Sequence, residues 1–265
     1  MLLAIDVGNT NITFGLFEVL APRERSSSSP VVKTSWRLST RRDATSDDYG
    51  ALLLALLTNQ GWETSRITAV AVASVVPPLD PVFEEISKRF FGLSPFFITP
   101  QTKTGIKILY HPASEVGADR IVNAVAAYAR VRSACLVVDF GTATTFDCID
   151  RRGNYLGGAI VPGPQAAAQV LFQKTAKLPL LGAFKRPEKA IGKNTVESMQ
   201  SGLFYGYLGM TEELIRRLKA EIGGKPRVLA TGGFSVLLEP FLKGVQEVVP
   251  DLTLEGLKII WDKNK

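Results

Sequence analysis

The chain has 265 residues, of which 46% are hydrophobic and 21% are charged. This is the composition of a folded globular protein that is long enough to bury a substantial core, as one large domain or two medium ones. No apolar run reaches the roughly 18 to 20 residues that a membrane-spanning helix needs. The first residues, Met1–Ile5, are too few for a signal-peptide core and run straight into a polar turn. We therefore expect a cytoplasmic protein that does not enter a membrane.

The chain is basic, with a formal net charge of +6. Such a charge serves either nucleic-acid binding or the binding of small anionic substrates such as ATP. The lysines and arginines are scattered along the sequence, without an aromatic-interleaved basic stripe or a zinc-finger spacing. A nucleic acid is therefore not the expected partner.

Histidine and cysteine are scarce. His111 is the single histidine, which removes most Ser-His-Asp and multi-histidine metal chemistries. Cys135 and Cys148 lie in apolar runs that resemble buried strands, and no cysteine or histidine spacing indicates zinc. They are predicted to be reduced core thiols and not a disulfide.

One pattern occurs twice, at Ala4–Phe14 and again at Val137–Asp147. Each copy is an apolar, β-branched run that ends in Asp, then x-Gly, then small hydroxyl or amide residues, then a second apolar run, which predicts a hairpin with a polar tip. A single copy would equally be an ordinary hairpin. The two aspartates, Asp6 and Asp139, lie about half the chain length apart. This spacing predicts two related halves that face each other across a nucleotide.

The residue types at these tips suit phosphate binding. Glycine lets the backbone turn and lets a ligand approach closely, while Asn and Thr add short donors around exposed N–H groups. An Asp at the end of the incoming strand offers a hard oxygen ligand for Mg²⁺ or its waters.

The first half reads as strands in a meander followed by alternating helix and strand. Its predicted elements are a strand and tip over Leu2–Asn11, a strand over Ile12–Val19, a flexible connection without chemistry over residues 20–30, a strand over Val31–Ser39, a helix opened by Asp47 and Asp48, a buried strand over Ile67–Val76, and a helix capped by Asp80 with Pro81 at its first position.

The segment Pro100–Gly117 is the predicted crossover between the halves, and a helix over Ile121–Val131 follows it. Asp119 and Arg120 fall in the first turn of that helix, where the predicted cleft should lie. A helix cap with a neighbouring surface charge would look the same in sequence.

The second half repeats the strand pattern with longer helices. Its predicted elements are strands over residues 134–140, 154–161 and 227–230, and helices over residues 165–171 and 196–222. Pro162-Gly163-Pro164 offers helix N–H groups to an anion. Thr231-Gly232-Gly233 would let a purine or ribose lie against the backbone, or would be a structural turn. Neither a P-loop nor a dinucleotide-binding fingerprint is present.

In combination, four segments resemble the ordered motif set of type III pantothenate kinases across nearly the whole chain. They are residues 6–11, 117–120, 139–145 and 157–163, with Asn194-Thr195 and Thr231-Gly232-Gly233 also in matching places. The serine-rich connection at residues 20–30 is longer than this resemblance leads us to expect.

This resemblance implies an α/β fold of two ribonuclease H-like domains, of the acetate and sugar kinase, heat-shock ATPase and actin superfamily, with the active-site cleft between them. We place the domains at residues 1–116 and 117–265, each with one phosphate hairpin. The implied activity is ATP-dependent phosphorylation of the primary hydroxyl of pantothenate, the first step of coenzyme A biosynthesis. The implied cofactors are Mg²⁺ and a monovalent cation, K⁺ or NH₄⁺, and the implied assembly is a homodimer.

The resemblance also assigns roles to residues. Asp119 is the general base, and Asp139 helps to bind the monovalent cation. The carboxylate chemistry of the first tip, and not the resemblance, makes Asp6 the expected holder of Mg²⁺ through water. The residues that contact ATP are Asp6, Val7, Gly8, Asn9, Thr10, Asn11, Ile12, Thr13 and Thr142. The residues that line the pantothenate site are Tyr110, Gly117, Ala118, Asp119, Arg120 and Thr195.

Reasoning from the residues agrees with this mechanism. Phosphoryl transfer needs mostly positioning and charge stabilisation, together with a base for the alcohol proton. With one histidine in the chain, a carboxylate is the expected base. Because the ordinary pKa of Asp is about 3.9, Asp119 is predicted to be a weak base that acts late. Two alternatives stay open: a regulator or accessory transcription factor of the same fold, and a kinase for another hydroxylated metabolite.

Overall fold

The computed structural model describes residues 1–19 and 30–265. They form two compact units: unit 1 is Met1–Arg130 with Asp251–Lys265, and unit 2 is Val131–Pro250. The predicted serine-rich connection falls on residues 20–29, apart from Pro30, and so lies outside the described residues.

Unit 1 is built on a five-stranded sheet of order β3-β2-β1-β4-β5. β1 (Leu2–Val7) and β2 (Asn11–Phe17) form an antiparallel hairpin, and β3 (Thr34–Ser39) pairs antiparallel with β2. β4 (Ala69–Ser74) runs parallel to β1, and the short β5 (Phe96–Phe97) runs parallel to β4. Because β1 and β4 are parallel neighbours, the residues that follow them meet at one edge of the sheet.

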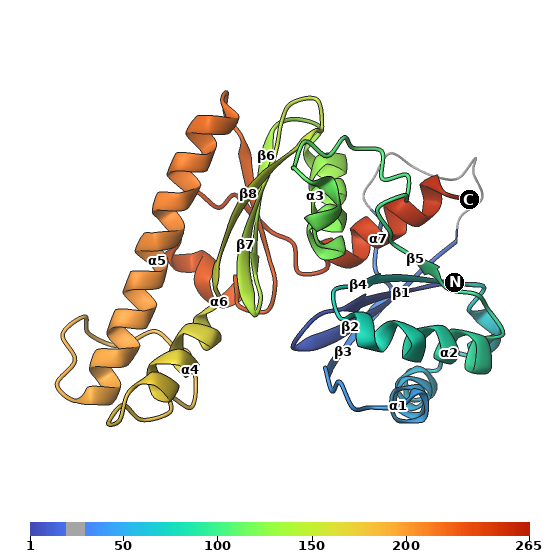
Figure 1. Ribbon diagram of the computed structural model, residues 1–265, viewed down its shortest axis with the longest axis horizontal. Helices are drawn as coiled ribbons and strands as arrows, with labels where there is room; N and C mark the ends of the chain where they lie inside the picture. Colours follow the sequence, from blue (N-terminus) through green and yellow to red (C-terminus); the bar gives the residue numbers. More distant parts are fainter. Residues whose placement is uncertain (20–29) are drawn as a thin grey trace. The chain divides into compact units, whose positions relative to one another are not determined.

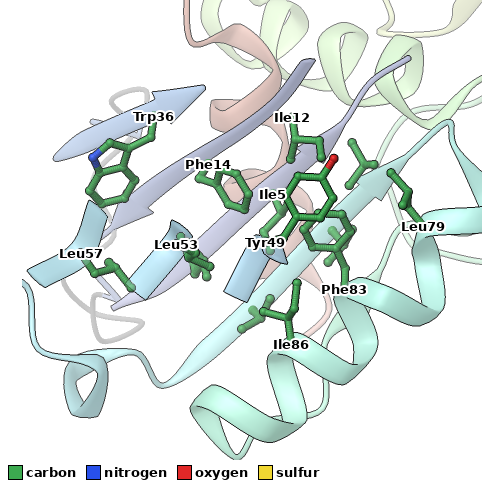
Figure 2. Packing of buried hydrophobic residues seen from close by; sticks show 14 of the residues in the cluster. Ile5, Ile12, Phe14, Trp36, Tyr49, Leu53, Leu57, Leu79, Phe83 and Ile86 are labelled. Carbon is green, nitrogen blue, oxygen red and sulfur yellow. The ribbon is translucent and has the colours of Figure 1, made fainter. Parts of the chain in front are cut away.

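Two helices, α1 (Ser46–Asn59) and α2 (Asp80–Phe91), cover one face of this sheet (Figure 1). Figure 2 shows their apolar side chains packed against the strands, with Tyr49 of α1 stacked on Phe83 of α2 at a ring-centroid distance of 5.6 Å. Burying one such side chain stabilises a fold by about 1.5–3 kcal/mol. The further buried members of this cluster include Leu3, Ile5, Val7, Ile12, Phe14, Leu16, Leu53, Leu57, Val72 and Ile86.

The other face of the sheet is covered by α3 (Ala118–Val131) and α7 (Leu252–Lys263). Its buried cluster joins strand residues to both helices, and includes Leu2, Ala4, Ala71, Val122, Val125, Leu254, Leu257 and Ile260. α3 therefore packs with unit 1, and α7 returns to that unit from the end of the chain. The sequence-based division placed the domain boundary after residue 116. The boundary between the compact units follows Arg130 instead, and unit 1 also includes Asp251–Lys265.

Unit 2 contains a second five-stranded sheet, of order β10-β9-β6-β7-β8. β6 (Cys135–Phe140), β7 (Ala143–Ile149) and β8 (Tyr155–Pro162) form an antiparallel meander. β9 (Arg227–Thr231) runs parallel to β6, and β10 (Glu247–Val248) runs parallel to β9. Counted in chain order, the strands of the two sheets thus have the same arrangement, with the first strand in the centre.

Three helices accompany this sheet: α4 (Pro164–Lys174), the long α5 (Thr195–Ile222) and the short α6 (Ser235–Leu238). Figure 1 shows α5 alongside the sheet, and its residues Phe204 and Tyr207 belong to the buried cluster of this unit. Within the part of the chain that the structure describes, no helix is long and apolar enough to cross a membrane. Short 3₁₀ turns occur at Thr64–Arg66, Pro77–Leu79, Ala113–Glu115 and Glu239–Phe241.

The internal repeat that the sequence indicated is confirmed strand by strand. β1 and β6 have the same order of buried and partly exposed residues, with Asp6 and Asp139 at the same place in it. β2 and β7 also share one burial pattern. The predicted α/β fold of two related halves, each with one Asp-containing hairpin, is therefore confirmed.

Two predicted helix starts have different outcomes. α1 begins beside its acidic residues as predicted, because the Asp48 N–H donates to Thr45 Oγ1 (3.2 Å) and the Thr45 N–H donates to Asp48 Oδ2 (2.8 Å). At α2 the predicted cap is wrong: Leu79 is the capping residue, Asp80 is the first helical residue and Pro81 the second. The 3₁₀ turn that ends at Leu79 runs directly into the helix, which leaves no place for a side-chain cap.

Candidate functional site

The tip of the first hairpin is a tight turn between β1 and β2. The Gly8 N–H donates to the Asn11 carbonyl oxygen (3.0 Å), and a Cβ at Gly8 would lie 2.9 Å from that oxygen. Asn9, Thr10 and Asn11 are exposed around this turn. The predicted polar tip is therefore present, with glycine where the chain comes closest to itself.

The residues on either side of this tip differ in what they can offer a ligand. Asp6 is partly exposed and lies opposite the partly exposed Thr13 in the strand register. Val7 and Ile12 have fully buried side chains that belong to the core of unit 1. Only the backbone of these two residues can therefore face a ligand.

A residue that sequence reasoning missed holds the first tip in place. Thr40 follows β3, and its N–H donates to the Thr10 carbonyl oxygen (2.9 Å) while its hydroxyl donates to the Gly8 carbonyl oxygen (2.6 Å). Because two tip carbonyls are bonded to Thr40, they are not directed at an anion. No local sequence signal links Thr40 to a tip about 30 residues earlier.

Asp119 lies in the first turn of α3, close to the edge of the sheet at which β1 and β4 end. A Cβ at the neighbouring Gly117 would lie 2.5 Å from Asp119 Oδ1 and 3.6 Å from Val75 Cγ1. The Val75 N–H in turn donates to the Val7 carbonyl oxygen (3.0 Å). Asp119 and Asp6 are therefore brought to the same edge of the first sheet, within unit 1.

The environment of Asp119 changes its acidity. Burial raises the pKa of this carboxyl above its ordinary value, although the Arg120 N–H, which donates to Asp119 Oδ1 (2.8 Å), acts in the opposite direction. The pKa of Asp119 therefore differs from the ordinary value on which the sequence-based prediction relied, because burial disfavours the charged form of a carboxyl group. A raised pKa makes the carboxylate a better proton acceptor.

The other predicted substrate residues of unit 1 lie around this carboxylate in sequence. Arg120 is only 7% exposed, whereas Tyr110, Gly117 and Ala118 are partly exposed. Because the guanidinium beside this carboxylate is buried, it can hold an acidic substrate only where the fold gives that substrate access to it.

The second hairpin tip, in unit 2, is held by glycines. The Gly163 N–H donates to the Thr142 carbonyl oxygen (3.0 Å), and a Cβ at Gly163 would lie 2.6 Å from that oxygen. Thr142 is exposed and Gly141 is partly exposed. Backbone atoms of the tip therefore occupy the space beside the Cα of Gly163, in the segment that was predicted to offer helix N–H groups to an anion.

Gly232 has a structural explanation as well. Its φ of +88° is one that side chains rarely adopt, and a Cβ there would lie 2.6 Å from the Phe140 N atom and would also meet Asp139 Oδ1. Of the two interpretations of Thr231-Gly232-Gly233, the structural turn accounts for Gly232. The missing side chain leaves room for the Asp139 carboxylate at the end of β6.

Tyr207 of α5 is a second residue that the sequence did not single out. Its hydroxyl shares a hydrogen bond with the buried Thr144, next to the second tip. Burial raises the pKa of Tyr207 to about 12, and the charge of Asp139 acts in the same direction. The phenol therefore stays protonated at neutral pH and fixes the start of β7 to α5.

Thr195 is the first residue of α5 and is exposed. The helix start is well capped, since the Glu197 N–H donates to Asn194 Oδ1 (2.9 Å) and the Lys193 N–H donates to Glu197 Oε2 (2.8 Å). Thr195 thus lies on a defined helix end within unit 2.

The described residues contain no group of three or more His, Cys, Asp or Glu side chains that could hold a metal ion by themselves. Cys135 and Cys148 are buried thiols that form no disulfide, as predicted, and burial raises the pKa of the Cys135 thiol to about 12.

Comparisons with known proteins show the family of this chain. The family model described as type III pantothenate kinase matches residues 2–217. The chain is 49% identical to the type III pantothenate kinase of Myxococcus xanthus (strain DK1622), over 100% of this chain and 99% of that one. It is 46% identical to the type III pantothenate kinase of Geobacter sulfurreducens, over 100% of both chains.

Among solved structures, a putative Baf family transcriptional activator from Campylobacter jejuni aligns with 99% of this chain and 98% of its own, with a TM-score of 0.59 and 17% sequence identity. At this identity the likeness concerns the fold alone. The family match and the full-length relatives go further, and they show that this chain belongs to the type III pantothenate kinase family.

Proposed function

We propose that this protein transfers the γ-phosphoryl group of ATP to the primary hydroxyl of pantothenate, which yields 4'-phosphopantothenate in the first step of coenzyme A biosynthesis. Family membership supports this reaction and this substrate. The observation that carries the chemistry is the partly buried Asp119, whose pKa is raised, at the sheet edge that also holds Asp6. We place the reaction in the cytoplasm.

In this proposal Asp119 is the general base. As the hydroxyl oxygen of pantothenate forms its bond to the γ-phosphorus, the hydroxyl proton passes to the Asp119 carboxylate and the bond from that phosphorus to the ADP oxygen breaks. The raised pKa of Asp119 brings its proton affinity closer to that of the alcohol in the transition state. Arg120 holds the pantothenate carboxylate, together with Tyr110, Gly117, Ala118 and Thr195.

ATP contacts the first hairpin through Asp6–Thr13 and the second through Thr142. Asp6 fits a magnesium site, because Mg²⁺ keeps several waters and binds through one or two carboxylates plus phosphate oxygens. The absence of a larger acidic cluster in the described residues agrees with that mode of binding. When bound, Mg²⁺ would neutralise part of the charge on the phosphates.

Asp139 is the proposed ligand of the monovalent cation, K⁺ or NH₄⁺. The carboxylate lies against the bare backbone of Gly232, so peptide groups as well as a carboxylate are at hand there. Carboxylate and carbonyl oxygens can coordinate K⁺ and can accept hydrogen bonds from NH₄⁺.

The first experiment measures ADP release by the purified protein with ATP and Mg²⁺, with and without pantothenate, in K⁺ and in Na⁺. We expect ADP release that requires pantothenate and is faster in K⁺. If folded protein gives no pantothenate-dependent ADP in either salt, the proposed reaction is wrong, and other hydroxylated acceptors become the next substrates to test.

A substitution tests the base. Asp119→Asn should lower kcat by roughly 10²-fold or more while ATP still binds. Glu115→Gln is the matched control, because Glu115 is an exposed carboxylate nearby in the chain. The activity of the unaltered protein should rise with pH through the raised pKa of Asp119, above the ordinary range of an Asp. Near-normal turnover of Asp119→Asn would remove this residue from the mechanism.

We also propose that the protein is a homodimer that associates through unit 2. Most of the large apolar side chains that remain exposed in the described chain lie in this unit, among them Leu156, Ile160, Val170, Phe172, Leu180, Ile191, Val196 and Tyr205. α4 and α5, which carry four of these residues, pack against each other. A second copy would remove this apolar surface from water.

Sedimentation velocity tests the assembly. Phe172→Glu, on α4, should shift the protein to a monomer at micromolar concentration, whereas Leu52→Glu should not, because Leu52 is exposed on α1 in unit 1. A monomeric unaltered protein, or equal behaviour of both variants, would contradict the proposal.

The two alternative functions are not favoured. The full-length relatives are named as kinases, and Asp6, Asp119 and Asp139 are all present here. A salt-sensitive mobility shift with DNA would speak for the regulator.

A further inference from the structure

The segment that follows β3 carries an arginine to the first phosphate hairpin. Arg42 Nη2 donates to the side-chain oxygen of Asn9 (3.0 Å), at the exposed tip of the turn. Thr40, two residues earlier, already binds two tip carbonyls. The tip and this segment therefore form one unit of structure, although they are far apart in sequence.

The core of unit 1 fixes the position of this segment. The Arg41 N–H donates to the hydroxyl of Tyr49 (2.6 Å), and that hydroxyl lies 3.2 Å from the Arg41 carbonyl oxygen. Tyr49 is 1% exposed and is stacked on Phe83. The backbone that leads into Arg42 is thus anchored on a rigid side chain, and Arg42 has a defined starting point.

The charge of Arg42 is not neutralised by a carboxylate within residues 1–19 and 30–265. Its only described polar partner is the neutral side chain of Asn9. Two other arginines of unit 1 differ in this respect: Arg41 lies 3.8 Å from Asp48, and Arg89 lies 2.9 Å from Asp47. An arginine of this kind beside a phosphate-binding turn has its charge available for an anion.

The hydrogen bond also sets what the tip presents. Because Asn9 Oδ1 accepts from Arg42, the Asn9 Nδ2 group is left to donate. Arg42 keeps further N–H groups, since a guanidinium has five of them in a planar fork. The pair therefore presents several N–H donors, which suit the oxygens of a phosphate chain.

We propose that Arg42 is a phosphate-binding residue, held in place by Asn9, that grips the polyphosphate chain of the nucleotide at the first hairpin. This inference rests on the proposed function, because it takes the ligand of that hairpin to be a nucleoside triphosphate. It adds a cation to a tip at which the sequence motif contributes only neutral donors and the Asp6 carboxylate. Charge-assisted hydrogen bonds from a guanidinium fork to phosphate oxygens are stronger than those from neutral groups.

The test compares Arg42→Gln with Arg41→Gln. Arg41 is the matched control, because it is the adjacent exposed arginine and its partner is Asp48. Calorimetric titration with MgATP, without pantothenate, should show a dissociation constant raised on the order of tenfold for Arg42→Gln and unchanged for Arg41→Gln. Arg42→Lys should recover part of the affinity, since it restores the charge without the fork. Adenosine should bind all these variants equally, because it carries no phosphate.

Two further readouts separate phosphate binding from a purely structural role. The loss on Arg42→Gln should shrink as salt is raised, because an exposed charge is screened. The effects of Asn9→Ala and Arg42→Gln should not add in the double variant, because each removes the same hydrogen bond.

The outcomes distinguish the two proposals. If the unaltered protein does not bind MgATP or shows no pantothenate-dependent ADP release, the proposed function is wrong. If the unaltered protein does both, and Arg42→Gln and Arg41→Gln bind MgATP equally well, the role of Arg42 is wrong. Additive losses in the double variant would overturn the claim that Asn9 holds Arg42.

Discussion

The two hairpins have the same strands and supports that are alike only in part. Both incoming strands carry an Asp at the same place in one burial pattern, and at both tips a backbone N–H donates to a tip carbonyl oxygen, from Thr40 at the first and from Gly163 at the second. At the first tip the Thr40 hydroxyl adds a second bond, to Gly8, which the glycine at the second tip has no side chain to make. The supporting residues follow β3 in one unit and β8 in the other, which are corresponding strands. The repeat thus explains where the carboxylates lie, and the residues after the third strand explain how the two tips differ.

The difference extends to electrostatics. Beside the first tip the positive charge is a side chain, Arg42, which is exposed and adjustable. Beside the second tip it is the amino-terminal end of α4, for which Gly163 is the capping residue, and this partial charge belongs to the backbone. A side-chain substitution can therefore change the positive charge beside the first tip, whereas the positive charge beside the second tip changes only if the backbone moves.

The largest expected effect comes from exchanging the two carboxylates for amides. Asp6→Asn should lower kcat/KM for MgATP by roughly 10²-fold, because a ligand of the metal–phosphate complex is lost. Asp139→Asn should instead raise the K⁺ concentration at which activity is half-maximal. Steady-state kinetics over a matrix of Mg²⁺ and K⁺ concentrations measures both. If the two variants change the same parameter, the proposed division of labour is wrong.

A methyl group at Gly163 should damage the second tip, whereas a methyl group at Gly182, in the same unit, should not. The new Cβ would meet the Gly141 and Thr142 carbonyl oxygens, so Gly163→Ala should lower the free energy of unfolding by about 1–3 kcal/mol and reduce activity. Gly182→Ala is the control, since nothing lies within 4 Å of a Cβ there. Chemical denaturation gives the stability, and an undiminished value for Gly163→Ala would show that the tip can move aside.

Glycines in two helices should respond with opposite signs. In α7 of unit 1, a Cβ at Gly256 would lie 2.7 Å from Val122 Cγ1 and would also meet the Val122 carbonyl oxygen. Gly256→Ala should therefore cost about 1–3 kcal/mol through overpacking. In α5 of unit 2, Gly209 has open space around it, so Gly209→Ala should stabilise by about 1 kcal/mol through helix propensity. Thermal unfolding of the two variants checks the signs, and stabilisation by Gly256→Ala would mean that α3 and α7 are less closely packed.

The smallest effect is expected at the first tip. Thr40→Val removes the hydroxyl that donates to Gly8 and should cost about 1 kcal/mol of stability, the net value of one hydrogen bond. Because the Thr40 N–H still holds Thr10, KM for ATP should rise only a few-fold. Thr40→Ser, which keeps the hydroxyl, should restore both quantities. If it does not, the methyl group and not the hydrogen bond is what matters.

Most of the strands could be predicted from local patterns. The β-branched run Ile67–Val76 contains β4, and the repeated Asp-x-Gly pattern marks both hairpins, since each signal lies within about ten residues. β5 and β10 have two residues each, which is too short for a pattern. α7 was missed because its apolar residues are interleaved with charged ones near a lysine-rich end, and only packing against α3 shows its place.

The features of the candidate site also divide into those that local patterns predict and those that depend on the fold. Asp6, Asp119 and Asp139 could be named from motifs, because motifs record which residue types lie together in sequence. The pKa of Asp119 could not be predicted, since it depends on burial. The hydrogen bonds of Thr40 and Arg42 join segments about 30 residues apart, and that of Tyr207 to Thr144 spans 63 positions. Such contacts follow from the fold and not from any local pattern.

The return of α7 to unit 1 has a consequence for how the chain is made. Unit 2 is continuous from Val131 to Pro250, so all of its residues leave the ribosome together. Unit 1 holds the earliest residues but lacks one wall of its core until Leu254, Leu257 and Ile260 have been synthesised. The part of the protein that is translated first is therefore the part that finishes folding last. Until α7 has been synthesised, some of the apolar side chains on this sheet face stay exposed.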